Sequence, residues 1–159
     1  MKNKKRKIAA GAILIFLMGI IFVFSAQTAG ESSHLSGNIS KFIFGVYEWL
    51  FGEVSGEREL RAMEIIHSLI RSLAHGFEYF LLEGAAFANA VLHLEKWKKA
   101  AFSSVLFCMI FALTDEIHQL FVEGRAFQLA DIAVDTLGAL VCLVICLWVT
   151  KDKLRMENG

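Results

Sequence analysis

Proline is missing from this sequence, and cysteine is scarce. None of the 159 residues is proline, and only three are cysteine: Cys108, Cys142 and Cys146. A soluble domain of this size normally redirects its chain with proline or with many polar turns, so the shortage of both disfavours that class. The three cysteines lie within apolar stretches, where a thiol behaves as a small hydrophobic group. This disfavours the disulfide scaffold of a small secreted domain.

Signatures of several common chemistries are missing as well. The sequence contains no phosphate-binding loop, no dinucleotide-binding fingerprint and no nucleophile elbow. Cationic and acidic residues both number 16, so net charge indicates no particular partner. The basic runs are short and flank apolar segments, and we therefore expect no nucleic-acid binding. No cofactor is expected either.

Long apolar segments account for most of what is present. Hydrophobic residues make up 56% of the chain, which is above the range of soluble globular domains. A helix of about 20 apolar residues crosses the hydrocarbon core of a bilayer. Four segments reach that length, so we expect an all-α integral membrane four-helix bundle that forms a single domain over residues 1–159. The expected spans are approximately 8–26, 65–92, 100–121 and 127–150.

Positive charge is distributed unevenly around these segments. Five cations precede the first segment, three lie between the second and third, and three follow the fourth, whereas residues 27–64 carry six glutamates. Cytoplasmic loops are enriched in Lys and Arg, so we expect both termini to be cytoplasmic in a multi-pass protein of the cell membrane. The basic leader is also compatible with a cleaved signal peptide, but the first apolar run is longer than a typical signal core.

Residues 27–64 contain an amphipathic stretch of their own. Apolar residues recur at helical spacing from Ile39 to Leu50, accompanied by Tyr47 and Trp49. Aromatic amphipathic helices settle at the membrane interface, and we expect an interfacial helix here. A short helix that covers the outer mouth of the bundle is an equally good interpretation.

Ionisable residues inside the apolar segments are the main functional signal. A charge near mid-membrane is costly, so such a residue is a functional candidate by default. In the second segment, helical spacing places five polar residues on one face. These are Arg71, His75, Glu78, Tyr79 and Glu83. The outer ends of the third and fourth segments and their link add Asp115, Glu116, Gln119, Arg125, Asp131 and Asp135.

We expect these residues to line a polar pocket that is open to the extracytoplasmic side. In this pocket Arg71 would pair with Glu78 or Asp115, and Arg125 would pair with Asp131. Gly138, in the fourth segment, could let another helix approach closely. Each residue also has a structural interpretation: Arg71 could extend to the interface, and Asp131 could simply favour a helix N-terminus.

Side-chain chemistry divides the polar set into expected roles. The candidate catalytic groups are those able to exchange protons: His75, Glu78, Asp115 and Glu116. The expected ligand-binding groups are Arg71, Tyr79, Gln119, Arg125, Asp131 and Asp135; an arginine fork suits carboxylates and phosphates. His75 and Glu78 with Glu116 form a weak candidate set of metal ligands, but they lack the spacing of a zinc signature, so no metal is expected.

Three stretches resemble the VanZ-like family. Residues 71–79, RSLAHGFEY, are similar to that family's R-x-x-x-H-x-x-E-Y segment, and residues 115–125, DEIHQLFVEGR, are similar to its D-E-x-H-Q-x-F-x-x-G-R segment. Residues 131–138, DIAVDTLG, match its closing D-x-x-x-[DN]-x-x-G. A serine-containing stretch over residues 24–36 fits more weakly. Two positions depart from the family pattern: Glu123 replaces a frequent proline, and Glu83 replaces a usual glycine.

The resemblance implies a bacterial membrane protein of the cell envelope. The family is named after a protein that accompanies glycopeptide resistance operons and raises teicoplanin resistance. The implied partners are membrane lipids and a lipid-linked cell-wall precursor or a glycopeptide. The pocket would bind a lipid headgroup or a lipid-linked ligand. A membrane enzyme that acts on a lipid phosphate or headgroup is the alternative, with His75 and Glu78 as an acid–base pair. A small transporter or proton relay is a third candidate, although only Glu83 extends the polar face inward.

Overall fold

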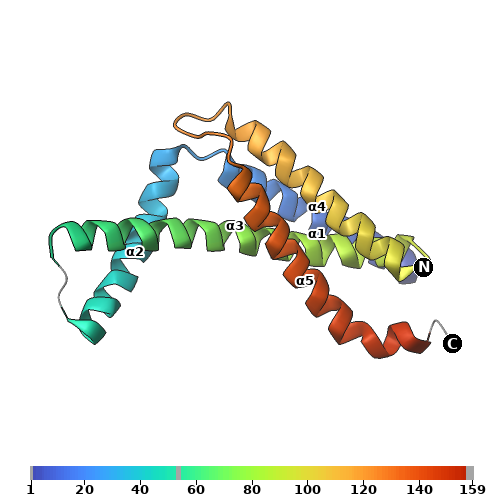
Figure 1. The fold of residues 1–159 in the computed structure, drawn as a ribbon. Coiled ribbons are helices and arrows are strands. Elements are labelled where there is room, and N and C mark those ends of the chain that lie inside the picture. The colour runs from blue at the N-terminus through green and yellow to red at the C-terminus, as the bar shows by residue number, and fades with distance from the viewer. Residues whose placement is uncertain (1, 53–54, 157–159) are drawn as a thin grey trace.

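The structure, a computed structural model, describes residues 2–52 and 55–156. These residues form five α-helices and no strand (Figure 1), which confirms the all-α prediction. The helices are α1 (Lys2–Ser25), α2 (Ala29–Phe51), α3 (Glu57–His93), α4 (Trp97–Gln119) and α5 (Leu129–Met156).

Three of these helices are long and apolar enough to cross a membrane. The candidate spans are Asn3–Ser25 in α1, Trp97–Gln119 in α4 and Leu129–Thr150 in α5, close to the first, third and fourth expected spans. They confirm a multi-pass membrane protein. The second expected span lies within α3, whose ionisable residues make it less apolar than the other three.

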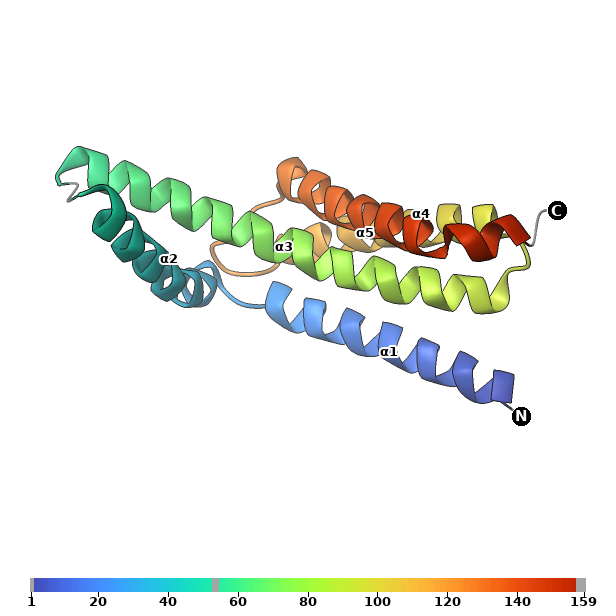
Figure 2. The ribbon, with the colours of Figure 1, turned by 90° about the horizontal axis from the view of Figure 1, so that it is seen from below.

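Helix α3 is the centre of the molecule. It packs most extensively against α5 and also contacts α1, α2 and α4. With 37 residues and a rise of 1.5 Å per residue, α3 is about 55 Å long, well beyond the roughly 30 Å hydrocarbon core. Figure 2 shows how this length is used: α1, α4 and α5 surround the C-terminal part of α3, and α2 lies along its N-terminal part.

Helix α2 contains the expected amphipathic stretch but begins earlier than the apolar pattern indicates. The reason is a capping box, in which the Thr28 backbone N–H donates to Glu31 and the Glu31 N–H donates to the Thr28 hydroxyl. The buried face of α2 carries Ser36, Ser40 and Phe44. The opposite face remains exposed.

A polar contact fixes α2 against α3. The Ser36 hydroxyl lies 2.7 Å from Nε2 of His67, which is on the N-terminal part of α3. This buried face packs α2 along the N-terminal part of α3. The exposed face of α2 carries large apolar side chains, including Phe42 and Trp49.

A close helix contact joins α3 to α5 through two glycines. A Cβ atom on Gly138 would collide with the backbone carbonyl of Gly76. The expectation that Gly138 permits a close helix approach is therefore confirmed. This contact fixes the height of α5 beside the polar part of α3.

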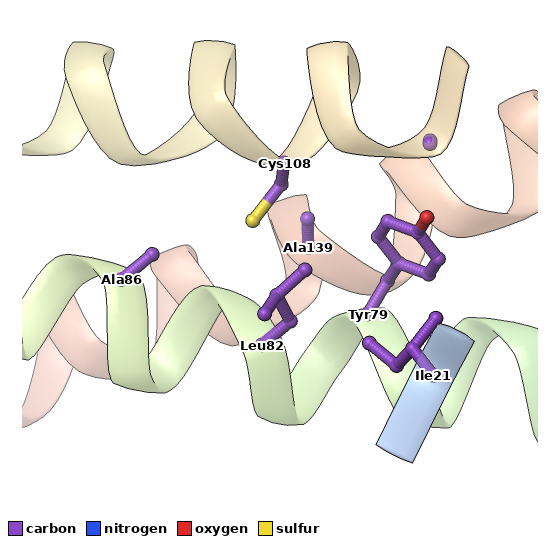
Figure 3. Close-up of a cluster of buried hydrophobic side chains, with 7 residues drawn as sticks. Ile21, Tyr79, Leu82, Ala86, Cys108 and Ala139 are labelled. Carbon is purple, nitrogen blue, oxygen red and sulfur yellow. The ribbon is translucent and has the colours of Figure 1, made fainter. Parts of the chain in front are cut away.

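Small side chains dominate the packed core. One buried cluster joins α1, α3, α4 and α5 (Figure 3). It consists of Ile21, Tyr79, Leu82, Ala86, Cys108, Ala112 and Ala139. A second buried cluster, centred on Phe87, Ala100 and Ala101, lies further along α3. The three cysteines are free thiols, as expected of small apolar groups.

The two ends of the assembly differ in their links. The N-terminus, the α3–α4 link and the C-terminus share one end in both views (Figures 1 and 2), which we call the basic end because the sequence places its clustered cations there. The links α1–α2 and α4–α5 lie at the opposite ends of α1, α4 and α5, beside the middle of α3 (Figures 1 and 2), and we call this level the cavity end. That the basic end faces the cytoplasm stays a prediction from charge.

Candidate functional site

A cavity of about 240 Å³ lies at the cavity end, where α1, α2, α3 and the α4–α5 link meet. Residues from four separate parts of the chain line it. Its lining consists of Phe24, Gln27, Ser32, Ser36, Ile39, Ile70, Arg71, Ala74, His75, Glu78 and Arg125. The walls therefore combine apolar side chains with two guanidinium groups.

Four of the residues singled out from sequence line this cavity. Arg71, His75 and Glu78 come from successive turns of α3, and Arg125 reaches it from the α4–α5 link. The turn before Arg125 needs Gly124, whose φ of 74° lies in the left-handed region that favours glycine. The two most specific motif segments thus converge on one cavity.

The cavity also contains residues that the polar pattern did not single out. Gln27 and Ser32 line it, and both belong to the weakly matching stretch 24–36. Ser36 bonds the Ser32 carbonyl through its hydroxyl at 2.7 Å, and Ser40 bonds the Ser36 carbonyl in the same way. The i, i+4 recurrence of these serines was the available sequence signal for the buried face of α2.

The expected ion pairs of Arg71 and Arg125 are wrong. Within the described residues, 2–52 and 55–156, the one salt bridge joins Arg61 to Glu57 at 2.9 Å, on the exposed surface of α3. Arg125 instead donates from Nε to the Gln27 carbonyl at 3.3 Å. The α4–α5 link carries Arg125 across to the α1–α2 link, where the Gln27 carbonyl is its hydrogen-bond partner, and Asp131 stays close enough to act on Arg125 only through its charge.

Both arginines retain buried donors. Nε of Arg71 and Nη1 of Arg125 are inaccessible to solvent and have no hydrogen-bond partner within the described part of the chain. Partial burial lowers the pKa of Arg125, and the positive charge of Arg71 lowers it further, whereas nearby acids such as Asp131 and Glu116 oppose this effect. An arginine remains protonated under such shifts, so two cations face the same region.

Asp115 and Glu116 lie in α4 beside the cavity but not in its lining. The Gln119 side-chain amide donates to Asp115 at 3.5 Å and to the Ser25 hydroxyl at 3.2 Å. Glu116 accepts a bond from the Gln128 backbone N–H at 2.8 Å, just before α5 begins. Adjacent acids therefore serve different neighbours: Asp115 faces α1, and Glu116 holds the entry to α5.

Several other polar groups of the predicted set are buried behind the cavity. Tyr79 and Asp135 are 0% and 1% exposed. The Tyr79 hydroxyl, Asp135 Oδ1, Asp131 Oδ2 and Gln119 Oε1 have no hydrogen-bond partner among the residues described. Buried polar atoms are normally satisfied, and leaving one unsatisfied costs about 1–3 kcal/mol. A cluster of such atoms lowers the stability of the fold, so stability alone does not explain why these residues are buried here.

The weak metal set is not assembled. No group of three or more His, Cys, Asp and Glu side chains in the described residues could hold a metal ion. His75 and Glu78 line the cavity, but Glu116 is directed to Gln128. Glu83 lies deeper, is 0% exposed and accepts a bond from the Ser104 hydroxyl at 2.6 Å.

Comparison with known proteins supplies the family. No curated protein and no solved structure matches the chain. The model of the VanZ/LLP1 family matches residues 11–150. This match includes the whole cavity and the three motif stretches. Because it covers most of the sequence, the chain belongs to the VanZ/LLP1 family of membrane proteins.

Proposed function

We propose that α3 is a fourth membrane span, so that the chain crosses the membrane four times with both termini in the cytoplasm. Its apolar side chains, such as Leu73 and Phe77, are exposed and would contact lipid, while its polar face turns to the cavity. The part of α3 before the span, together with α2, would lie at the outer interface. The exposed Phe42 and Trp49 of α2 support this placement.

The function we propose for the chain is that of a bacterial envelope protein whose outward cavity binds a lipid headgroup or a lipid-linked ligand, and which contributes in this way to glycopeptide resistance, including resistance to teicoplanin. One observation carries the proposal: residues of two family segments, Arg71, His75, Glu78 and Arg125, line a single cavity. A cavity for a drug-sized ligand measures about 300–1,000 Å³. The 240 Å³ observed here suits one small headgroup better than a whole glycopeptide.

Drug susceptibility tests this proposal. The chain is expressed in a teicoplanin-sensitive Gram-positive host, and the minimum inhibitory concentration is measured with membrane levels checked by blot. We expect wild type to raise resistance and Arg125→Ala and His75→Ala to abolish the increase. Arg61→Gln is the matched control, because Arg61 lies on the same helix but is exposed and pairs with Glu57.

Two outcomes would contradict the proposal. If well-expressed wild type leaves susceptibility unchanged, the chain does not act in glycopeptide resistance. If wild type raises resistance but both cavity variants do so equally, the cavity is not the mechanism.

A second candidate function is a membrane enzyme that acts on a lipid phosphate or headgroup. The observation in its favour is that His75 and Glu78, one helical turn apart, line the same cavity as the two arginines. An acid–base pair beside groups that stabilise negative charge is the minimum for such chemistry. Incubating the purified protein with polyprenyl phosphates and phospholipids should then give a product that His75→Ala does not form. No product from any of these lipids would reject the enzyme.

A further inference from the structure

The cavity has a charge pattern that selects among the possible headgroups. Two guanidinium groups, one carboxyl group and one imidazole line it, so the cations outnumber the acid in the lining itself, and acids such as Asp131 and Glu116 act on Arg125 from behind the lining. The donors Arg71 Nε and Arg125 Nη1 are buried and have no partner in the part of the chain that the structure describes. Both side chains line the cavity, and an arginine donates a stronger hydrogen bond to an anionic acceptor than to a neutral one.

The two arginines come from different elements, and this restricts the geometry of an anion that both can bind. Arg71 projects from the middle of α3, whereas Arg125 is tied to the Gln27 carbonyl at the α1–α2 link. A carboxylate has two oxygens in one plane and is matched by a single arginine fork. A tetrahedral phosphate offers oxygens in several directions and can accept from two forks on different elements at once. Ser32 also lines the cavity, and a serine side chain can donate a further hydrogen bond.

The rim of the cavity indicates what is attached to the phosphate. Phe24 at the end of α1 and Ile39 on α2 both line the cavity and are 44% and 50% exposed. Phe24 lies one residue from the end of the first candidate span, so the rim lies where hydrocarbon meets the headgroup layer. An exposed apolar rim at this depth suits an acyl or polyprenyl chain, and a free inorganic ion would gain nothing from it.

From these features we infer that the ligand is a phosphate-bearing amphiphile, whose phosphate lies between Arg71 and Arg125 and whose chain leaves over Phe24 and Ile39. This inference rests on the proposed function and sharpens it by naming the headgroup chemistry. Carboxylate lipids and free phosphate are the alternatives that the experiment separates.

Native mass spectrometry of the purified full chain, released from detergent micelles, provides the test. The probes are phosphatidic acid, diacylglycerol with the same chains, oleic acid and inorganic phosphate. We expect saturable binding of phosphatidic acid, little binding of diacylglycerol or oleic acid, and no competition by inorganic phosphate at equal concentration. Loss of one charge-assisted contact should weaken binding about tenfold or more in Arg71→Gln and in Arg125→Gln, with Arg61→Gln unchanged. Arg71→Lys and Arg125→Lys keep the charge and should bind with intermediate strength, which guards against variants that merely misfold.

Each contrary result has a distinct meaning. Phosphatidic acid binding that neither Gln variant weakens would overturn the phosphate site, and equal binding of oleic acid would overturn its selectivity for phosphate. Competition by inorganic phosphate at equal concentration would overturn the role of the chain. The proposed function is tested separately by drug resistance, and that measurement does not depend on which headgroup is bound. If cavity variants still abolish resistance, none of the binding results above contradicts the proposed function.

Discussion

The parts of α3 before and after Tyr79 differ in the polarity of the side chains that they bury. From Arg71 to Tyr79 the helix presents polar groups to a cavity, and several polar atoms in and behind that cavity have no hydrogen-bond partner among the described residues. From Leu82 to His93 the buried positions are mostly apolar, with Leu82, Ala86 and Phe87 in packed clusters. Glu83 interrupts them: one of its carboxyl oxygens accepts a bond from Ser104, and the other, Oε2, is the one buried polar side-chain atom of this half without a partner among the described residues.

This difference indicates that one part of α3 mainly stabilises the fold and the other mainly serves the binding site. Close packing of small and apolar side chains stabilises the half toward the basic end. The half toward the cavity end keeps polar atoms that cost stability, which is the usual cost of a binding site. Substitutions should therefore move stability in one half and function in the other.

The largest expected effect lies outside this contrast, at the backbone contact between Gly76 of α3 and Gly138 of α5. Gly138→Ala places a methyl group against the backbone of Gly76, and because backbone cannot move aside as a side chain can, we expect a loss of about 3 kcal/mol or more in the free energy of unfolding. Thermal unfolding of the purified protein in detergent measures it. Gly19→Ala is the control, since its Cβ would have no neighbour within 4 Å; an equal loss in both variants would contradict the close contact.

The next effect tests the polar contact in the basic half. Ser104→Ala removes the hydroxyl that donates to Glu83 at 2.6 Å and leaves a fully buried carboxyl group without that bond. We expect a loss of about 1–3 kcal/mol with wild-type drug resistance and lipid binding wherever the protein is folded. Ser103→Ala, on a neighbouring position of α4, is the control. Lost lipid binding in folded Ser104→Ala would show that the cavity half depends on Glu83.

A smaller effect of opposite sign is expected in the cavity half. Tyr79→Phe removes a hydroxyl that is buried without a partner in the described region and keeps the ring in its apolar cluster. The variant should be as stable as wild type or more stable by about 1 kcal/mol. Lipid binding or resistance should fall if the hydroxyl serves the ligand. A clear loss of stability would instead mean that the hydroxyl has a structural partner, and the contrast between the halves would weaken.

Much of the architecture could be predicted from the sequence because it depends on local patterns. The third expected span, 100–121, differs from Trp97–Gln119 by a few residues, and the glycine contact followed from Gly138. The partners of the arginines could not be predicted. The bond from Arg125 to the Gln27 carbonyl joins residues 98 positions apart, and a backbone acceptor leaves no trace in side-chain patterns.

The α2 helix shows the same limit. Its apolar stretch indicated a helix near Ile39, yet the start at Ala29 depends on the capping box of Thr28 and Glu31. The contact of Ser36 with His67 could not be predicted without knowing that α2 folds back on α3. His67 stands at the edge of an apolar segment, and nothing in the local pattern around it indicates a partner on another helix.

The smallest effect concerns this start of α2, which forms one wall of the cavity. Hydrogen bonds from the Thr28 backbone and hydroxyl lower the pKa of Glu31 below its usual 4.5. A carboxyl group with a lowered pKa stabilises the fold above its unfolded pKa, and this contribution disappears as pH falls through the folded value. Hydrogen exchange at the first turn of α2, corrected for the intrinsic rate, should therefore show less protection as the pH falls below the usual range of a glutamate carboxyl group. In Glu31→Gln that change in protection should vanish, and if it persists unchanged, another acid controls the start of the helix. Because only the wall next to Ser32 is loosened, lipid binding should weaken slightly in the acidic range, far less than in either arginine variant.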